Sequence, residues 1–142
     1  MFRIIFGLFR DISVFLYRLT GGKIGGHMQG LSVLLLRTTG RKTRKERITP
    51  LGYFTQDGDY VITASNAGSG KNPGWFLNLR ANPRVTIEVN DRQVEAQAEV
   101  ATAEKRSALW SRLISLSPAY ANYARKTTRQ IPLVILHPLK NG

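Results

Sequence analysis

A strongly basic segment, LRTTGRKTRKERITP, spans residues 36 to 50 and joins two apolar stretches. It contains one acidic residue and six cations, namely Arg37, Arg41, Lys42, Arg44, Lys45 and Arg47. Gly40 permits a tight turn at the end of the first stretch. Main-chain N–H groups and the side chains of Arg41, Lys42 and Arg47 can therefore converge on one anion. A phosphate suits such a hairpin, although basic hairpins also bind nucleic-acid backbones.

A second unusual segment, ASNAGSGKNPGWFLNL, spans residues 64 to 79. Its small residues allow a ligand to lie against the backbone, and it leads into the start of a predicted helix, which favours an anion. Trp75 offers a flat apolar surface there, unless it belongs to the core. Together with the basic hairpin, this segment favours a ligand in which a flat ring is joined to phosphate.

The composition limits the other possibilities. The chain has 142 residues, 42% of them hydrophobic, which predicts one globular domain. Its formal charge of +12 favours an anionic partner, whether nucleic acid, membrane surface or phosphorylated small molecule. The chain has no cysteine, which excludes disulfides and thiolate chemistry. The two histidines, His27 and His137, have no partner pattern, so no metal site is predicted.

The elements that must position these residues are mainly strands. Alternation and β-branched residues predict six of them, over residues 31–39, 47–55, 59–65, 84–90, 93–101 and 131–138. Asp57-Gly58 and Asn90-Asp91 are typical of tight hairpin turns. Helical spacing predicts helices over residues 72–83, 102–117 and 118–129. Six short strands with mostly short connections predict a closed or nearly closed antiparallel barrel with flanking helices.

The first 22 residues, MFRIIFGLFRDISVFLYRLTGG, form a separate predicted element. Charged residues interrupt the apolar run, so it is too short to span a membrane. At helical spacing the charges share a narrow stripe, and the rest of the surface is apolar. We therefore expect an amphipathic helix over residues 1–22, ahead of a barrel domain over residues 23–142. This helix either lies on an anionic membrane surface or packs on protein.

Three segments, in this order, resemble the deazaflavin-dependent nitroreductase family: TTGRKTRKERITPL, ASNAGSGKNPGWFLNLRANPRVTIEV and PAYANYARKTTRQIPLVIL. The resemblance covers residues 30 to 138. It implies a split β-barrel related to FMN-binding reductases, and it implies coenzyme F420, in preference to FMN, as the cofactor. F420 is an 8-hydroxy-5-deazaflavin with a phosphodiester and an oligoglutamate tail, so the basic hairpin would bind its anionic part.

By position, the resemblance places the cofactor contacts on Arg41, Lys42, Arg47, Pro50, Leu51, Ala64, Ser65, Asn66, Ala67, Trp75 and Asn78. The three cations would hold the phosphate and tail, and the other residues would line or support the ring pocket. The catalytic positions would be Ser65, Tyr120 and Tyr123, with Arg129 beside the two tyrosines. Gly52-Tyr53 and Ser117 stand where family members have tyrosines, and Asn66 replaces a lysine of some members, so we expect extra space at the substrate wall.

The resemblance implies an oxidoreductase that transfers hydride from reduced F420 to a lipophilic acceptor such as a quinone, an enone or a nitroaromatic compound. Ser65, Tyr120 or solvent would supply the proton. A carrier that binds the deazaflavin without turnover is the alternative. Nucleic acid is not expected as a partner, because no exposed aromatics alternate with the cations. We expect a cytoplasmic monomer or homodimer, with attachment to the inner face of the cell membrane left open.

Overall fold

The computed structural model describes residues 11–12, 14–19, 27–28 and 30–139. Its strands are β1 (His27–Met28), β2 (Leu31–Thr39), β3 (Glu46–Gln56), β4 (Asp59–Thr63), β5 (Arg84–Val89), β6 (Arg92–Val100) and β7 (Leu133–Pro138). Its helices after β4 are the 3₁₀ helix η1 (Asn66–Gly68), α2 (Gly74–Ala81), α3 (Ala103–Leu116) and α4 (Ala119–Arg125). An N-terminal helix includes residues 11–12 and 14–19; the rest of the expected helix over residues 1–22 lies outside the described residues.

The strands form one antiparallel sheet in the order β1-β2-β3-β4-β7-β6-β5, and a further pairing of β2 with β5 closes six of them into a barrel. This confirms the split β-barrel and the six predicted strands, each within two residues of its expected bounds. The hairpin turns also lie where the turn residues predicted them, because Asp57, Gly58 and Asn90 all have positive φ angles. β1 is a two-residue addition beside β2 that the sequence pattern did not indicate.

β2 is apolar along most of its length because both of its faces are buried. Leu34 and Leu36 belong to the main hydrophobic cluster, together with Trp75 and Phe76 of α2. The alternate residues Val33 and Leu35 pack outward, against the N-terminal helix. Burial on two faces therefore explains why this strand is an unbroken apolar run, whereas β6 alternates.

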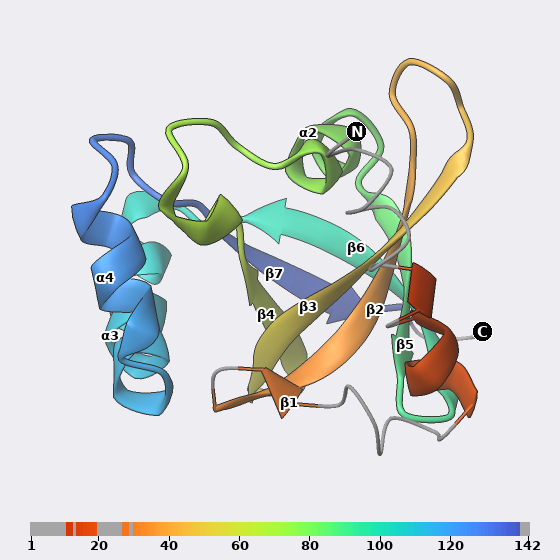
Figure 1. Ribbon diagram of the computed structural model, residues 1–142, viewed down its shortest axis with the longest axis horizontal. Coiled ribbons are helices and arrows are strands. Elements are labelled where there is room, and N and C mark those ends of the chain that lie inside the picture. The colour runs from red at the N-terminus through yellow and green to blue at the C-terminus, as the bar shows by residue number, and fades with distance from the viewer. Residues whose placement is uncertain (1–10, 13, 20–26, 29, 140–142) are drawn as a thin grey trace.

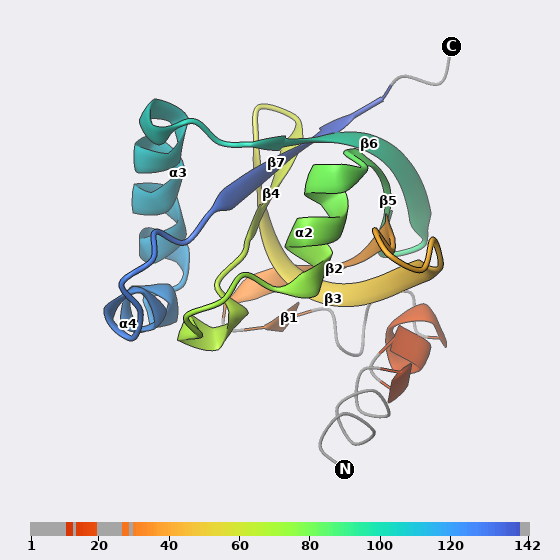
Figure 2. The ribbon, with the colours of Figure 1, turned by 90° about the horizontal axis from the view of Figure 1, so that it is seen from above.

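The helices occupy three places around the barrel (Figures 1 and 2). α2 packs into the main cluster through its buried face and lies across one opening of the barrel. α3 and α4 lie together on one side, where Leu109, Leu113 and Tyr120 share a second cluster with strand residues. Thr102 caps α3 by accepting a hydrogen bond from the Lys105 N–H at 3.5 Å.

The N-terminal helix packs on the barrel side opposite α3 and α4 (Figure 2). Val14 and Tyr17 are buried against β2, and the Tyr17 hydroxyl donates to the Val33 carbonyl at 2.9 Å. Arg18 donates two hydrogen bonds to the Glu88 carboxylate, at 3.1 and 2.6 Å. One face of the expected amphipathic helix is thus used for packing on its own domain. Among the residues that the structure describes, no helix is both long and apolar enough to cross a membrane.

The barrel opens along the first half of β3. β3 pairs with β2 over residues 46–53, but it pairs with β4 only over residues 53–56. The edge of β3 over residues 46–52 therefore faces α2 and η1 without a paired strand, as Figure 1 shows where β3 and β4 diverge. This gap is where most of the residues predicted to bind the cofactor come together.

Candidate cofactor and acceptor site

A cavity of about 390 Å³ lies between the basic hairpin and α2; we call it the tail cavity. Its lining residues are Gly40, Arg41, Lys42, Thr43, Arg47, Thr49, Gly74, Trp75 and Asn78. The three cations that the sequence predicted for the phosphate all lie here. No acidic residue belongs to this lining, and in the described part of the chain neither Lys42 nor Arg47 forms an ion pair. Such a cavity has the charge and polarity that a phosphate and carboxylate tail requires.

The turn of the hairpin depends on a glycine and a left-handed residue. The Gly40 N–H donates to the Lys45 carbonyl at 2.7 Å, and the Arg44 N–H donates to the Gly40 carbonyl at 2.9 Å. Arg44 has φ of 61°. A Cβ at Gly40 would lie 2.7 Å from the Thr43 hydroxyl oxygen, which is too close for two non-bonded atoms. The glycine therefore permits the tight return that presents the cations on one side.

Asn78 joins the hairpin to α2. Its side chain is buried, and its Oδ1 accepts hydrogen bonds from Arg41, from the backbone N–H at 3.2 Å and from Nη1 at 3.0 Å. Its Nδ2 lies 3.5 Å from the Thr38 hydroxyl, to which it donates. Asn78 thus fixes the direction of Arg41 at the wall of the tail cavity.

A second cavity of about 320 Å³ adjoins the first; we call it the ring cavity. Its lining residues are Thr49, Leu51, Gly52, Thr63, Ser65, Asn66, Pro73, Trp75, Tyr120 and Tyr123. Thr49 and Trp75 line both cavities, so the two lie next to each other along β3. Four lining residues were not predicted from the sequence as part of the site, namely Thr49, Thr63, Pro73 and Gly74. Thr49 could have been found, because it alternates with Arg47 and Leu51 on the same face of β3.

Two tyrosines from α4 close one side of the ring cavity. The rings of Tyr120 and Tyr123 meet edge to face, with centroids 5.4 Å apart and an angle of 84°. Burial raises the pKa of the Tyr120 hydroxyl, and Tyr123 raises it further. The Tyr120 hydroxyl therefore keeps its proton at neutral pH and is a hydrogen-bond donor at this wall.

The expected extra space at the substrate wall is only partly present. A Cβ at Gly52 would lie 3.2 Å from Leu31 and 3.5 Å from the Tyr120 hydroxyl oxygen, so these side chains occupy part of the room. The expectation for Ser117 is wrong. Ser117 is 1% exposed at the C-terminal end of α3 and lines neither cavity. A small residue at position 117 therefore does not enlarge the site.

The remaining predicted residues take varied positions. Ala64 is fully buried in the main hydrophobic cluster. Ala67 lies in η1, and its side chain is outside the description. Pro50 pairs with Leu35 on the face of β3 opposite Leu51 and lines neither cavity. Arg129, which was expected beside the two tyrosines, donates hydrogen bonds from its guanidinium to the loop that follows β4.

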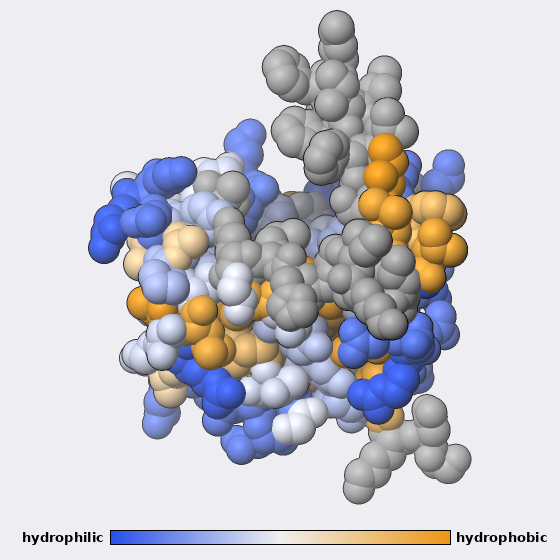
Figure 3. Space-filling view, turned by 60° about the horizontal axis from the view of Figure 1, so that its bottom comes forward, coloured by the Kyte–Doolittle hydropathy of each residue, from blue (hydrophilic) through white to orange (hydrophobic). Residues whose placement is uncertain are grey.

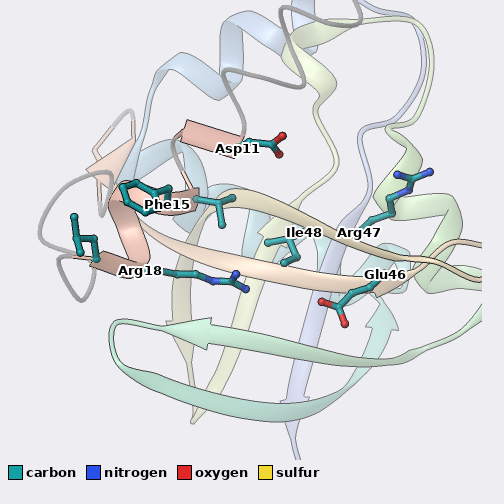
Figure 4. A pocket seen from close by; sticks show the side chains of 8 residues that line it. Asp11, Phe15, Arg18, Glu46, Arg47 and Ile48 are labelled. Carbon is teal, nitrogen blue, oxygen red and sulfur yellow. The ribbon is translucent and has the colours of Figure 1, made fainter.

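A third and larger cavity, of about 600 Å³, lies between the N-terminal helix and β3. Figure 4 shows Phe15 and Arg18 of the helix on one side of it and Ile48 of β3 on the other. Arg47 borders this cavity as well as the tail cavity. The lining of this third cavity includes acidic as well as basic residues, so the cavity lacks the purely positive charge that distinguishes the tail cavity.

The fold and the paired cavities describe a split-barrel protein that can hold a flat ring and its anionic tail. Residues 9–138 match the family model of the F420H(2)-dependent quinone reductases, and the chain belongs to that family. It is 40% identical over 127 residues to an F420H(2)-dependent quinone reductase of Mycobacterium tuberculosis, which covers 85% of this chain and 84% of the relative.

Two solved structures are also similar. The F420-H2 dependent reductase FDR-A is 35% identical, with a TM-score of 0.68, and the match covers 74% of this chain and 93% of that one. A second structure, titled as a domain-swapped dimer, is 30% identical, with a TM-score of 0.71 and coverage of 89% and 95%. The family membership, the mycobacterial quinone reductase and FDR-A support the cofactor predicted from the motifs, coenzyme F420.

Proposed function

We propose that this protein is an F420H2-dependent quinone reductase, which transfers a hydride from reduced F420 to a quinone. The observation that carries the proposal is that the two cavities are neighbours, with Thr49 and Trp75 lining both. One cavity is lined by cations without acids and the other by aromatic and small residues, as a ring with an anionic tail requires. The family membership agrees with this assignment.

The residues present fit the cofactor. Arg41, Lys42 and Arg47 would hold the phosphate and the glutamate tail, while Trp75 and Leu51 would border the ring. Reduced F420 supplies a hydride equivalent from C5 of its ring. The protein's own contribution is to place the acceptor against that ring and to exclude water, so no metal or thiol is needed for this step.

Tyr120 and Tyr123 form the acceptor side of the proposed site. A quinone that gains a hydride also needs a proton on oxygen, and the protonated Tyr120 hydroxyl is positioned at the wall to donate a hydrogen bond there. The Ser65 hydroxyl, which also lines the ring cavity, is a second protein group that can hold a proton. The tyrosine rings also present an apolar surface, which suits a quinone ring.

Turnover distinguishes this enzyme from a protein that only carries the deazaflavin. Purified protein mixed with reduced F420 and a short-chain quinone should restore the absorbance of oxidised F420 in proportion to the quinol formed. Tyr120→Phe should retain cofactor binding and lower kcat. Tight binding of F420 without oxidation of the reduced form by any quinone or nitroaromatic compound would support the carrier alternative instead.

We also propose that the N-terminal helix brings the enzyme to an anionic membrane surface, where lipophilic quinones concentrate. While Val14 and Tyr17 face the barrel, Ile12, Phe15 and Leu19 are 50%, 61% and 69% exposed. Figure 3 shows apolar side chains gathered at the surface over this helix. An exposed apolar ridge on a basic protein supports an interfacial contact.

Sedimentation with anionic liposomes tests the membrane proposal. Phe15→Ser with Leu19→Ser should abolish sedimentation while leaving F420 affinity unchanged. Leu116→Ser is the matched control, because Leu116 is 43% exposed on α3. If the wild-type protein remains in the supernatant at low salt, the membrane proposal fails. A shift to a smaller species in the double variant would identify the ridge as a contact between two copies.

A further inference from the structure

Arg129 makes four hydrogen bonds to one loop, although it lies far from that loop in sequence. Its Nε donates to the Ser69 carbonyl at 2.9 Å, and its Nη1 donates to the Asn72 side-chain oxygen at 2.9 Å. Its Nη2 donates to the carbonyls of Ala64 and Ser65, at 3.1 and 2.9 Å. A planar guanidinium can bind several oxygens in a fixed arrangement, which a lysine cannot reproduce.

The two carbonyl contacts determine where the neighbouring amides point. In a trans peptide the N–H points opposite to the C=O, so the N–H groups of Ser65 and Asn66 point away from Arg129. Neither N–H donates a hydrogen bond to another group in the described part of the chain. Both residues line the ring cavity. Two donors without a protein partner therefore belong to residues of the cavity wall.

The local backbone shape brings these donors together, and it needs support. Ser65 is right-handed, with φ of −74° and ψ of −33°, and Asn66 has φ of 47°. Successive residues of opposite hand direct their N–H groups to one concave side. A left-handed conformation is unfavourable for a residue other than glycine, so contacts must hold it. The Asn66 side chain contributes by donating to the Lys71 carbonyl at 3.0 Å.

The same loop is packed against the helix that carries the tyrosines. A Cβ at Gly68 would lie 3.0 Å from the Tyr123 carbonyl oxygen and 3.0 Å from the Lys126 side chain. Gly68 has φ of 81°, so both its conformation and its close approach require glycine. Arg129 follows that helix in the chain and returns to the loop. The Arg129 side chain thus adds a second link between the two walls of the ring cavity.

We propose that Arg129 is a positioning residue for the cofactor ring. It holds the carbonyls of Ala64 and Ser65 so that the N–H groups of Ser65 and Asn66 remain free to donate to the carbonyl edge of the deazaflavin. This inference rests on the proposed function, because it takes the ring cavity as the deazaflavin site. It assigns to Arg129 a task in binding the cofactor rather than one in contacting the acceptor.

The test compares Arg129→Met and Arg129→Lys with Arg125→Met. Arg125 is exposed on α4, and among the described residues its side chain donates a hydrogen bond only to the nearby Asn122. Its variant therefore removes the same charge without touching the loop. Amide hydrogen exchange is measured on each protein without cofactor, and the Kd for oxidised F420 is measured by fluorescence titration. Arg129→Ala is also titrated with added guanidinium chloride.

Both Arg129 variants should exchange the amides of residues 65–72 about tenfold faster or more, with the rest of the barrel unchanged. Their Kd for F420 should rise about tenfold or more, the scale of one or two lost hydrogen bonds. Guanidinium should restore part of the affinity of Arg129→Ala. Arg125→Met should match the wild type in both measurements.

Wild-type exchange and a wild-type Kd in Arg129→Met would overturn the inference, as would faster exchange spread evenly over the barrel. Loss of affinity to the same extent in Arg125→Met would also overturn it, because charge alone would then explain the result. If the wild-type protein does not bind F420, the proposed function fails and this inference fails with it. An unchanged Arg129→Met in a protein that does bind F420 removes this inference alone.

Discussion

The basic hairpin and the cluster around His137 both concentrate charge on the barrel, but they pair it differently. In the cluster, His137 Nδ1 lies 3.1 Å from Asp59 and its Nε2 lies 2.7 Å from Glu99. Glu99 also pairs with Lys105 at 3.0 Å. In the hairpin, Lys42 and Arg47 have no acidic partner in the described part of the chain.

The paired charges around His137 stabilise the fold, whereas the unpaired cations of the hairpin are available to bind an anionic ligand. The His137 cluster, which consists of His137, Asp59, Glu99 and Lys105, joins β4, β6, β7 and α3. Each of its charged side chains pairs with another member of the cluster. The hairpin cations repel one another unless an anion is bound, so they are retained at a cost in stability. Cationic side chains that lack an acidic partner and lie beside an aromatic cavity therefore indicate a binding site better than a high density of charge alone.

The largest change in F420 affinity is expected for a substitution in the hairpin. Lys42→Ala should weaken F420 binding by about 1 to 3 kcal/mol, because one charge-assisted contact to the tail is lost. The free energy of unfolding should stay the same or rise slightly, since no protein partner loses its contact. Fluorescence titration and thermal melts measure the two quantities. Unchanged affinity at low salt would mean that the tail lies elsewhere.

Asn78→Ala should affect both quantities, because this buried amide serves the fold and the site together. The change leaves Thr38 and the Arg41 N–H without their partner, and we expect a loss of about 1 to 2 kcal/mol in the free energy of unfolding. F420 affinity should fall as well, since Arg41 is no longer held at the cavity. Denaturant melts and titration check this; a variant that changed affinity but not stability would contradict the structural role.

The smallest effect is expected at the paired cluster. Hydrogen bonds to Glu99 and Asp59 raise the pKa of His137, so protonated His137 favours the folded state. His137→Phe should lower the free energy of unfolding by about 0.5 to 1 kcal/mol. This expected loss is small because the side chain is partly exposed and solvent screens its ion pairs. F420 affinity should not change. Equal unfolding free energies at pH 6 would show that the cluster contributes nothing.

The pH dependence of that difference follows from the direction of the two pKa shifts. Because the pKa of His137 is raised in the folded state, its contribution is complete below its ordinary value of 6.5 and disappears as the pH rises through the folded value. The pKa of Glu99 is lowered, chiefly by His137, so its contribution is complete above its ordinary value of 4.5 and is lost in stronger acid. The free energies of unfolding of the wild type and His137→Phe should therefore differ most between pH 4.5 and pH 6.5, as measured by melts across this range.

Much of the fold could be predicted because its signals are local. Alternation and runs of apolar, β-branched residues identified the six strands, and Asp57-Gly58 and Asn90-Asp91 identified two turns. β1 and η1 were missed because two or three residues show no period. The cations of the tail cavity were also found from their clustering. The buried position of Ser117 and the loop contacts of Arg129 could not be found, since they depend on residues brought together only by the closed barrel.

In the site that we propose, the hairpin binds the anionic tail while the adjoining cavity binds the ring. The most direct test is to titrate the wild-type protein with F420 and with the same deazaflavin lacking its phosphate and glutamates, at low and high salt. We expect F420 to bind at least about tenfold tighter at low salt, and we expect the difference to shrink as salt screens the cations. Equal affinities at low salt would contradict the account.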